Sequence, residues 1–130
     1  MNPTPALPAL HDAHDAGALR VLVVDDDADA AESLAFCLQM EGREVRFVTH
    51  AEEALHIAES FSPHVALIDI FMPELDGHSL ATRLRQRFGE DIAVVAVTGA
   101  LKTVELDAFD GHLMKPIDFA QLDRLLSAPR

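Results

Sequence analysis

The sequence has one cysteine, Cys37, among 130 residues, and few basic residues. A single cysteine excludes an intramolecular disulfide framework and a zinc site built from several cysteines. This count suits a reducing compartment, so we expect a cytoplasmic protein. The 10 lysines and arginines stand against 22 acidic residues, and the net charge of −12 repels nucleic acid and anionic membranes. We therefore expect neither a nucleic-acid partner nor a membrane partner.

Long apolar runs are also missing. No stretch approaches the roughly 18 residues of a membrane span, and the N-terminus lacks the basic-then-apolar pattern of a secretory signal. Residues 1–18 contain Pro3, Pro5 and Pro8 and show no sustained period. We therefore expect a flexible N-terminal tail over 1–18, followed by one domain over 19–128.

From Leu19 onward, short apolar runs alternate with segments of helical period. The runs predict strands at residues 20–24, 44–48, 64–69 and 92–97, with a fifth at 112–114. Helices are expected over residues 28–41, after a capping box from Thr49 to Glu52, after Gly77, and from a second capping box that begins at Asp118. This alternation predicts an α/β fold with a doubly wound parallel sheet and helices on both faces.

Polar residues stand at the ends of four of these expected strands. Asp25 and Asp26 follow the first strand, Asp69 ends the third, Thr98 follows the fourth and Lys115 follows the fifth. Ligands of an open parallel sheet bind beyond the carboxyl ends of its strands. Three carboxylates gathered there would repel one another without a cation, and Mg²⁺ prefers carboxylate and phosphate oxygens. With a lysine and a hydroxyl as partners for phosphoryl oxygens, the set predicts a phosphoryl-transfer site.

Each of these residues alone also has a plainer interpretation. An acidic residue after a strand often caps the next helix, which is our interpretation of Asp27 and Asp29. A lone aspartate such as Asp69 is more often a turn former, and Thr98 and Lys115 stand in segments typical of turns and loops. The occurrence of all four sets in order, at four strand ends, favours the joint interpretation.

The segments that carry these residues resemble the signature segments of response-regulator receiver domains. They are VVDDD at 23–27, IDIFMPELDG at 68–77, VTG at 97–99 and LMKP at 113–116. The resemblance covers residues 19–128 and implies a five-stranded sheet of order 2-1-3-4-5. It implies two-component or phosphorelay signalling, with a histidine kinase or histidine phosphotransfer protein as donor and an output protein that the sequence does not identify. A homodimer stays open, as does the choice between a relay and a terminal switch.

The resemblance also implies roles for individual residues, beginning with Asp69 as the phospho-acceptor. The groups implied to hold Mg²⁺ are Asp25, Asp26, Asp69 and the backbone carbonyl of Phe71. The residues implied to bind phosphate or to switch are Thr98, Lys115 and His112, and Pro116 is implied to follow a cis peptide bond. Such a receiver is not an enzyme with a separate substrate, because it catalyses only its own phosphorylation and dephosphorylation.

The connection between Thr98 and Lys115 departs from the family pattern. It is about five residues shorter than in most members. We therefore expect a fourth helix of about two turns within residues 103–109, or a distorted segment in its place. His112 stands at the aromatic switch position. An inward-turning, pH-sensitive switch and a half-exposed strand residue with no switching role are equal alternatives for it.

The neighbours of the acceptor also depart from the pattern. Phe71 and Ala100 offer no polar group to guide a water molecule, so we hypothesise slow loss of the phosphoryl group. Arg83, Arg85 and Arg87 are interpreted as an exposed helix face, with a docking patch as the minor alternative.

Other classes of protein fit the sequence less well. A receiver-fold interaction module that works without phosphorylation is the main alternative, and the complete set of polar residues argues against it. An aspartate-nucleophile phosphatase of the haloacid dehalogenase kind needs a second acid two residues after the nucleophile, where Phe71 stands. A Gly-rich phosphate loop followed by Lys-Ser or Lys-Thr is absent, which excludes that class of nucleotidase.

Overall fold

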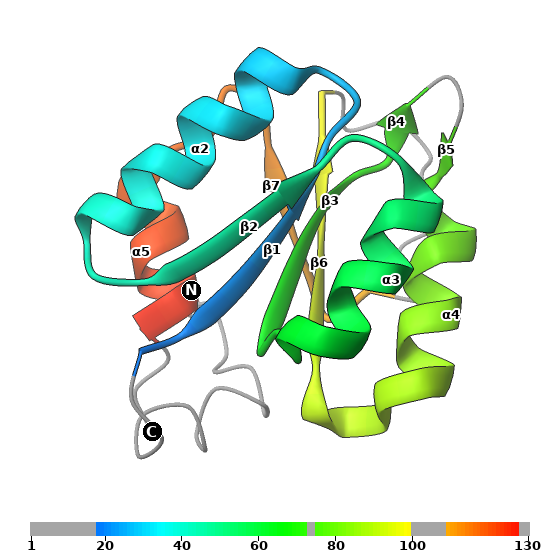
Figure 1. Cartoon of the computed structure of the whole chain (residues 1–130). Helices are drawn as coiled ribbons and strands as arrows, with labels where there is room; N and C mark the ends of the chain where they lie inside the picture. The colour runs from blue at the N-terminus through cyan, green and yellow to red at the C-terminus, as the bar shows by residue number, and fades with distance from the viewer. Residues whose placement is uncertain (1–17, 73–74, 100–108, 128–130) are drawn as a thin grey trace.

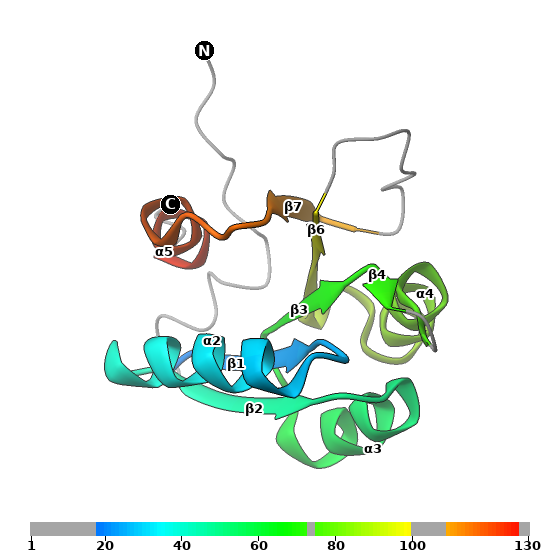
Figure 2. The ribbon, with the colours of Figure 1, turned by 90° about the horizontal axis from the view of Figure 1, so that it is seen from above.

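A five-stranded parallel sheet lies between two layers of helices (Figures 1 and 2). The computed structural model describes residues 18–72, 75–99 and 109–127. The strands of this sheet follow the order β2-β1-β3-β6-β7, which is 2-1-3-4-5 when its members are numbered along the chain. The expected doubly wound α/β fold and its strand order are therefore confirmed.

The observed elements match the expected ones to within about one residue at most ends. The sheet strands are β1 (Arg20–Val24), β2 (Glu44–Val48), β3 (Val65–Asp69), β6 (Ala93–Thr98) and β7 (Gly111–Met114). The helices are α2 (Ala28–Met40), α3 (Ala51–Phe61), α4 (Gly77–Phe88) and α5 (Phe119–Ser127). Three short elements were not predicted: the hairpin strands β4 (Phe71–Met72) and β5 (Leu75–Asp76), and the 3₁₀ turn η1 (Gly89–Asp91).

The sheet separates two apolar cores, because successive side chains of a strand point to opposite faces. In β1, Val21 and Val23 join the core under α2 and α5, whereas Leu22 and Val24 join the core under α3 and α4. Figure 2 shows these two pairs of helices on opposite sides of the sheet. Every residue of β3 and β6 is buried, as expected of strands that helices cover on both faces.

Two helix starts follow their predicted capping residues. The Asp27 carboxylate accepts hydrogen bonds from two backbone N–H groups in the first turn of α2, at 3.1 and 3.2 Å. Asp118 does the same for α5, at 2.9 and 3.3 Å. The capping interpretation of Asp27 and the start of the last helix are therefore confirmed.

The capping box expected from Thr49 to Glu52 was wrong. His50, not Thr49, holds the cap position of α3, and its side chain makes no cap hydrogen bond. The Thr49 hydroxyl instead lies 3.1 Å from His50 Nδ1. The helix begins one residue later than the capping pattern requires. Thr49 therefore lies one residue before the cap position, from which its hydroxyl does not serve the first turn.

Two further expectations concern parts of the chain outside the described residues. The tail over 1–18 falls there except for its last residue, and the fourth helix within 103–109 falls there except for Phe109. Phe109 is not helical, and its side chain packs against the core under α3 and α4. Within the described part of the chain, no helix is long and apolar enough to cross a membrane.

The arginines of α4 form ion pairs inside the domain. Arg83 pairs with Glu52 of α3 at 3.8 Å. Arg87 pairs with Glu59, also of α3, at 2.5 Å. Arg85 pairs with Asp110, which lies just before β7. The interpretation as an exposed face holds for Arg83 and Arg87, whereas the Arg85 side chain is only 31% exposed.

Asp110 connects β6 to the start of β7. Its backbone N–H donates to Val94 O at 2.7 Å, and its carboxylate accepts from Val94 N at 2.7 Å. Val94 has no exposed surface. Without the carboxylate, the Val94 N–H would therefore be left inside the sheet with no acceptor.

We expect the Asp110→Ala variant to lose about 2 kcal/mol of unfolding free energy, because it leaves the buried Val94 N–H group without an acceptor. Urea denaturation followed by circular dichroism measures the loss. Asp123→Ala is the matched control, since it removes an exposed carboxylate paired with Arg43 at 3.0 Å. It should cost less than about 1 kcal/mol. Equal losses in the two variants would mean that Asp110 is only another surface ion pair.

Candidate functional site

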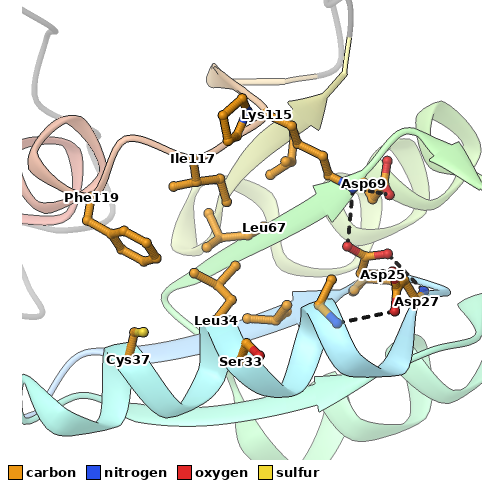
Figure 3. Close-up of a pocket in the computed structure, with 15 residues that line it drawn as sticks. Asp25, Asp27, Ser33, Leu34, Cys37, Leu67, Asp69, Lys115, Ile117 and Phe119 are labelled. Carbon is orange, nitrogen blue, oxygen red and sulfur yellow. Dashed lines mark hydrogen bonds and ion pairs between the residues drawn. The ribbon is translucent and has the colours of Figure 1, made fainter.

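The polar residues predicted at the strand ends lie at one edge of the sheet. Asp25 directly follows β1, Asp69 ends β3 and Thr98 ends β6, while Lys115 directly follows β7. The strands are parallel and β1, β3 and β6 are neighbours, so their carboxyl ends share this edge. Figure 3 shows Asp25, Asp69 and Lys115 turned toward one another.

Three carboxylates gather at this edge. Oxygen atoms of Asp25, Asp26 and Asp69 all lie within 4.8 Å of one another. Asp25 and Asp69 are only 7% and 6% exposed, whereas Asp26 is exposed. Like charges this close, two of them withdrawn from water, are unfavourable without a cation. The donor set consists of carboxylate oxygens, which fits a hard divalent cation such as Mg²⁺.

Lys115 is the cation that the described residues place at this site. Its Nζ donates to Asp69 Oδ2 at 2.9 Å and lies 3.5 Å from Asp25 Oδ2. Its backbone N–H donates to the carbonyl of Thr98 at 2.8 Å, which fixes the chain beside β6. The peptide bond from Lys115 to Pro116 is cis, as the family resemblance implied.

Burial and charge act in opposite directions on Lys115. Burial lowers the pKa of this ammonium, but the hydrogen bond and the charge of Asp69, together with the charge of Asp25, outweigh it. The net effect raises the pKa of Lys115. The side chain is therefore a fixed positive charge at neutral pH.

The Asp25 carboxyl is not fully compensated by the charge of Lys115. Burial raises the pKa of the Asp25 carboxyl above its ordinary value, and the neighbouring charge of Asp69 adds to the rise. The hydrogen bond from the Asp27 N–H, at 2.9 Å, and the charge of Lys115 act the other way without cancelling it. The site therefore favours an added positive charge, either a proton or a metal ion.

This raised pKa gives a pH dependence of stability. A carboxyl with a folded-state pKa above its unfolded value contributes stability that is complete below the unfolded pKa and is lost as pH rises through the folded pKa. In EDTA, we therefore expect the native chain to gain stability relative to Asp25→Asn as pH falls from neutrality toward the ordinary pKa of an aspartic acid. Urea denaturation at several pH values measures this difference. Parallel pH profiles for the two chains would show that Asp25 is not the responsible group.

The other predicted site residues occupy the expected places in the chain. Thr98 is 2% exposed at the end of β6. His112 is exposed on β7, and both interpretations of its role stay predictions. Phe71 begins β4, two residues after Asp69, and its backbone carbonyl as a metal ligand also stays a prediction. Ala100 lies outside the described residues.

A cavity of about 580 Å³ beside these residues was not predicted. It lies between α2 and the connection from β7 to α5, and Asp25, Asp69 and Lys115 line one end of it. Cys37 is half-buried in its wall. Phe119 also lines it and is 46% exposed. Helical spacing predicts on which face of a helix a residue lies. It does not predict how far that face lies from the neighbouring element, so it could not predict this cavity.

Fold and site together define a doubly wound α/β protein with three carboxylates and a lysine at the carboxyl edge of its sheet. The family model of the response regulator receiver domain matches residues 21–127. The chain therefore belongs to the response regulator receiver domain family.

The chain is also similar to curated proteins over most of its length. The chain is 37% identical over 112 residues to an uncharacterized 14.6 kDa protein of Leptolyngbya boryana, covering 82% of this chain and 86% of the relative. It is 39% identical over 109 residues to the transcriptional regulatory protein PrrA of Mycobacterium tuberculosis, covering 79% of this chain. The chain spans 46% of PrrA, about half the length of that relative.

Solved structures of receivers share the fold. A CheY-like receiver domain from Methylobacillus flagellatus superposes with a TM-score of 0.78 at 30% identity, over 85% of this chain and 98% of that one. The response regulator TrrA of Thermotoga maritima, in complex with Mg²⁺-BeF, gives 0.72 at 30% identity, over 81% and 93% of the two chains. TrrA in complex with the histidine kinase ThkA gives 0.71 at 30% identity, over 81% and 92%.

Proposed function

We propose that this receiver accepts a phosphoryl group on Asp69, in a Mg²⁺-dependent transfer from a phosphohistidine on a histidine kinase or histidine phosphotransfer protein. One juxtaposition carries the proposal. The buried Asp69 carboxylate lies 2.9 Å from Lys115 Nζ, inside a group of three carboxylates whose oxygens lie within 4.8 Å of one another. Family membership supports it, as do the Mg²⁺-BeF and kinase complexes of the similar receiver TrrA.

Each residue of the site has its own role in the transfer. An Asp69 carboxylate oxygen attacks phosphorus while the bond from phosphorus to the histidine nitrogen breaks, which leaves an aspartyl phosphate. Lys115 binds one phosphoryl oxygen and the Thr98 hydroxyl donates to another. Asp25 and Asp26, with Asp69 and the backbone carbonyl of Phe71, hold Mg²⁺. The metal supplies charge neutralisation at the phosphoryl group.

The output of such a transfer is a change in protein–protein interaction. Phosphorylation of Asp69 replaces the partner of Lys115 with a more negative group, and so biases the domain toward a second arrangement of this edge. A partner that binds this arrangement better then receives the signal. In this proposal the domain acts in the cytoplasm and catalyses only its own phosphorylation and dephosphorylation.

Intact-mass spectrometry tests the proposal directly. We expect the chain to gain one phosphoryl group when it is incubated with acetyl phosphate or a phosphohistidine protein and Mg²⁺, and to gain none in EDTA. Peptide mapping should place the group on Asp69. Because Phe71 and Ala100 cannot guide water, we expect the adduct to decay over minutes or longer, and decay within seconds would contradict that hypothesis. Absence of any adduct with either donor would favour a module that binds its partners without phosphorylation.

A further inference from the structure

The cavity beside Asp69 has one polar end and apolar walls. Its polar end is formed by Asp25, Asp69 and Lys115. Most of the remaining lining is apolar and includes Val23, Leu34, Leu67, Val97, Ile117 and Phe119, although Asp27 and Ser33 of the α2 side also contribute. In Figure 3, Phe119 of α5 and Leu34 of α2 reach toward each other across the space that leads to Lys115.

The size and lining of this cavity suit a small organic molecule. Its volume of about 580 Å³ lies within the range of small-molecule sites, which are mostly apolar with a few placed polar groups. The Phe119 side chain lines the cavity and yet is 46% exposed, so apolar surface faces solvent there. An apolar ligand would remove that surface from water.

The cavity also leads to the reactive carboxylate. Asp69 is only 6% exposed, and its side chain forms part of the lining. A donor whose phosphoryl group lies against Asp69 and Lys115, with its leaving oxygen on the side of phosphorus away from Asp69, can therefore extend its remaining atoms into the cavity. Those atoms must be uncharged and apolar, because the walls beyond the polar end are mainly aliphatic and aromatic.

We propose that Asp69 also accepts phosphoryl groups from small acyl phosphates with an extended apolar acyl chain, and that this chain lies in the cavity between α2 and α5. The inference rests on Asp69 being the phospho-acceptor. An Asp69 oxygen forms a bond to phosphorus while the bond between phosphorus and the acyl carboxyl oxygen breaks. The acyl group then leaves as a carboxylate, so no oxidant, reductant or proton donor is required.

Chain length is the property that distinguishes such donors. The two-carbon acyl group of acetyl phosphate is too short to fill a cavity of about 580 Å³, whereas a six-carbon group adds four methylenes. Each buried methylene is worth up to about a fourfold gain in binding. Partial burial of four methylenes predicts at least about a tenfold higher kcat/KM for hexanoyl phosphate than for acetyl phosphate. Saturated acyl groups of different length leave with closely similar basicity, so intrinsic reactivity does not create this preference.

Rates of phosphorylation by acetyl, butanoyl and hexanoyl phosphate, in Mg²⁺ and followed by intact mass, test the inference. The native chain should show a stepwise rise with acyl length. Cys37→Phe and Ser33→Phe fill the cavity from α2 and should each reduce the hexanoyl-to-acetyl ratio at least about fivefold. Met40→Phe is the matched control, because Met40 lies on the same helix, is 72% exposed and is outside the cavity lining, so the ratio should stay native. Unfolding midpoints establish that each variant is folded.

Three results overturn the inference and leave the proposed function intact. They are equal rates for all three acyl phosphates, a preference that survives both cavity-filling variants, and labelling by a phosphohistidine protein but by no acyl phosphate. In each of these cases the cavity is not the site that selects the acyl chain. Absence of labelling by every donor overturns both the inference and the proposed function.

Discussion

The Asp69→Asn variant is expected to gain no phosphoryl group under conditions that label the native chain fully. An amide is not a nucleophile for phosphorus. Among the described residues no other carboxylate lies as close to Lys115, whose Nζ lies 2.9 Å from Asp69 and 3.5 Å from Asp25. Intact mass after incubation with acetyl phosphate and Mg²⁺ measures the loss. A native rate of labelling in this variant would place the acceptor elsewhere in the chain.

The same variant should be more stable than the native chain when no metal is bound. Asp69 lies in a group of three carboxylates whose oxygens lie within 4.8 Å of one another, and two of these carboxylates are buried. Replacing it with a neutral amide removes its repulsion with Asp25 and Asp26, and we expect a gain of about 1 kcal/mol in EDTA. In Mg²⁺ the order should reverse, because the native chain keeps a ligand that the variant has lost.

Asp27→Asn is the matched control for both measurements. Asp27 lies two residues from Asp25 but outside the group of three carboxylates. Its side chain caps α2, and asparagine caps a helix about as well as aspartate. The control should therefore be labelled at the native rate, with native stability in EDTA and in Mg²⁺. A loss equal to that of Asp69→Asn would mean that any change of charge at this edge stops the reaction.

The carboxylate cluster could be predicted from sequence because one geometric rule brings its members together. Asp25, Asp69 and Thr98 end or follow strands whose apolar runs are readable along the chain, and parallel strands end at a common edge. Their separation in sequence therefore does not matter. Lys115 follows β7 and obeys the same rule, although β7 itself has only four residues.

Features set by tertiary contacts were not predictable in this way. The arginines of α4 find carboxylates on other elements, as Arg87 does with Glu59 and Arg85 with Asp110, and no local spacing encodes those pairs. The hairpin of β4 and β5 rests on two paired positions, which is too short for a hydrophobic pattern. The cavity likewise depends on the distance between α2 and α5, which is set by the packing of both helices on the sheet.

A second large effect is expected at Gly77, the first residue of α4. A methyl group on Gly77 would lie 2.8 Å from Ile70 Cα and 3.0 Å from Ile70 Cγ2. The first of these atoms belongs to the backbone and cannot rotate away. Ile70 is also held by its N–H, which donates to the carbonyl of Val97 in β6 at 3.1 Å. The strain must therefore move α4 away or push the chain that carries Asp69.

We expect Gly77→Ala to lose about 3 kcal/mol of unfolding free energy, the upper end of the usual cost of overpacking. We also expect phosphorylation to slow more than about tenfold, because displacement of Ile70 moves the adjoining Asp69 relative to Lys115. Urea denaturation and the rate of labelling by acetyl phosphate measure the two effects.

Gly99→Ala is the matched control, since Gly99 also follows a strand at this edge of the sheet. A methyl group there meets no atom of the described residues within 4 Å, so its cost should stay within about 0.5 kcal/mol. If Gly77→Ala lost stability but kept the native labelling rate, α4 would be the element that yields. If it kept both, the contact between Gly77 and Ile70 would be looser than 2.8 Å implies. Loss of both quantities together would show that the start of α4 fixes the position of the acceptor strand's end.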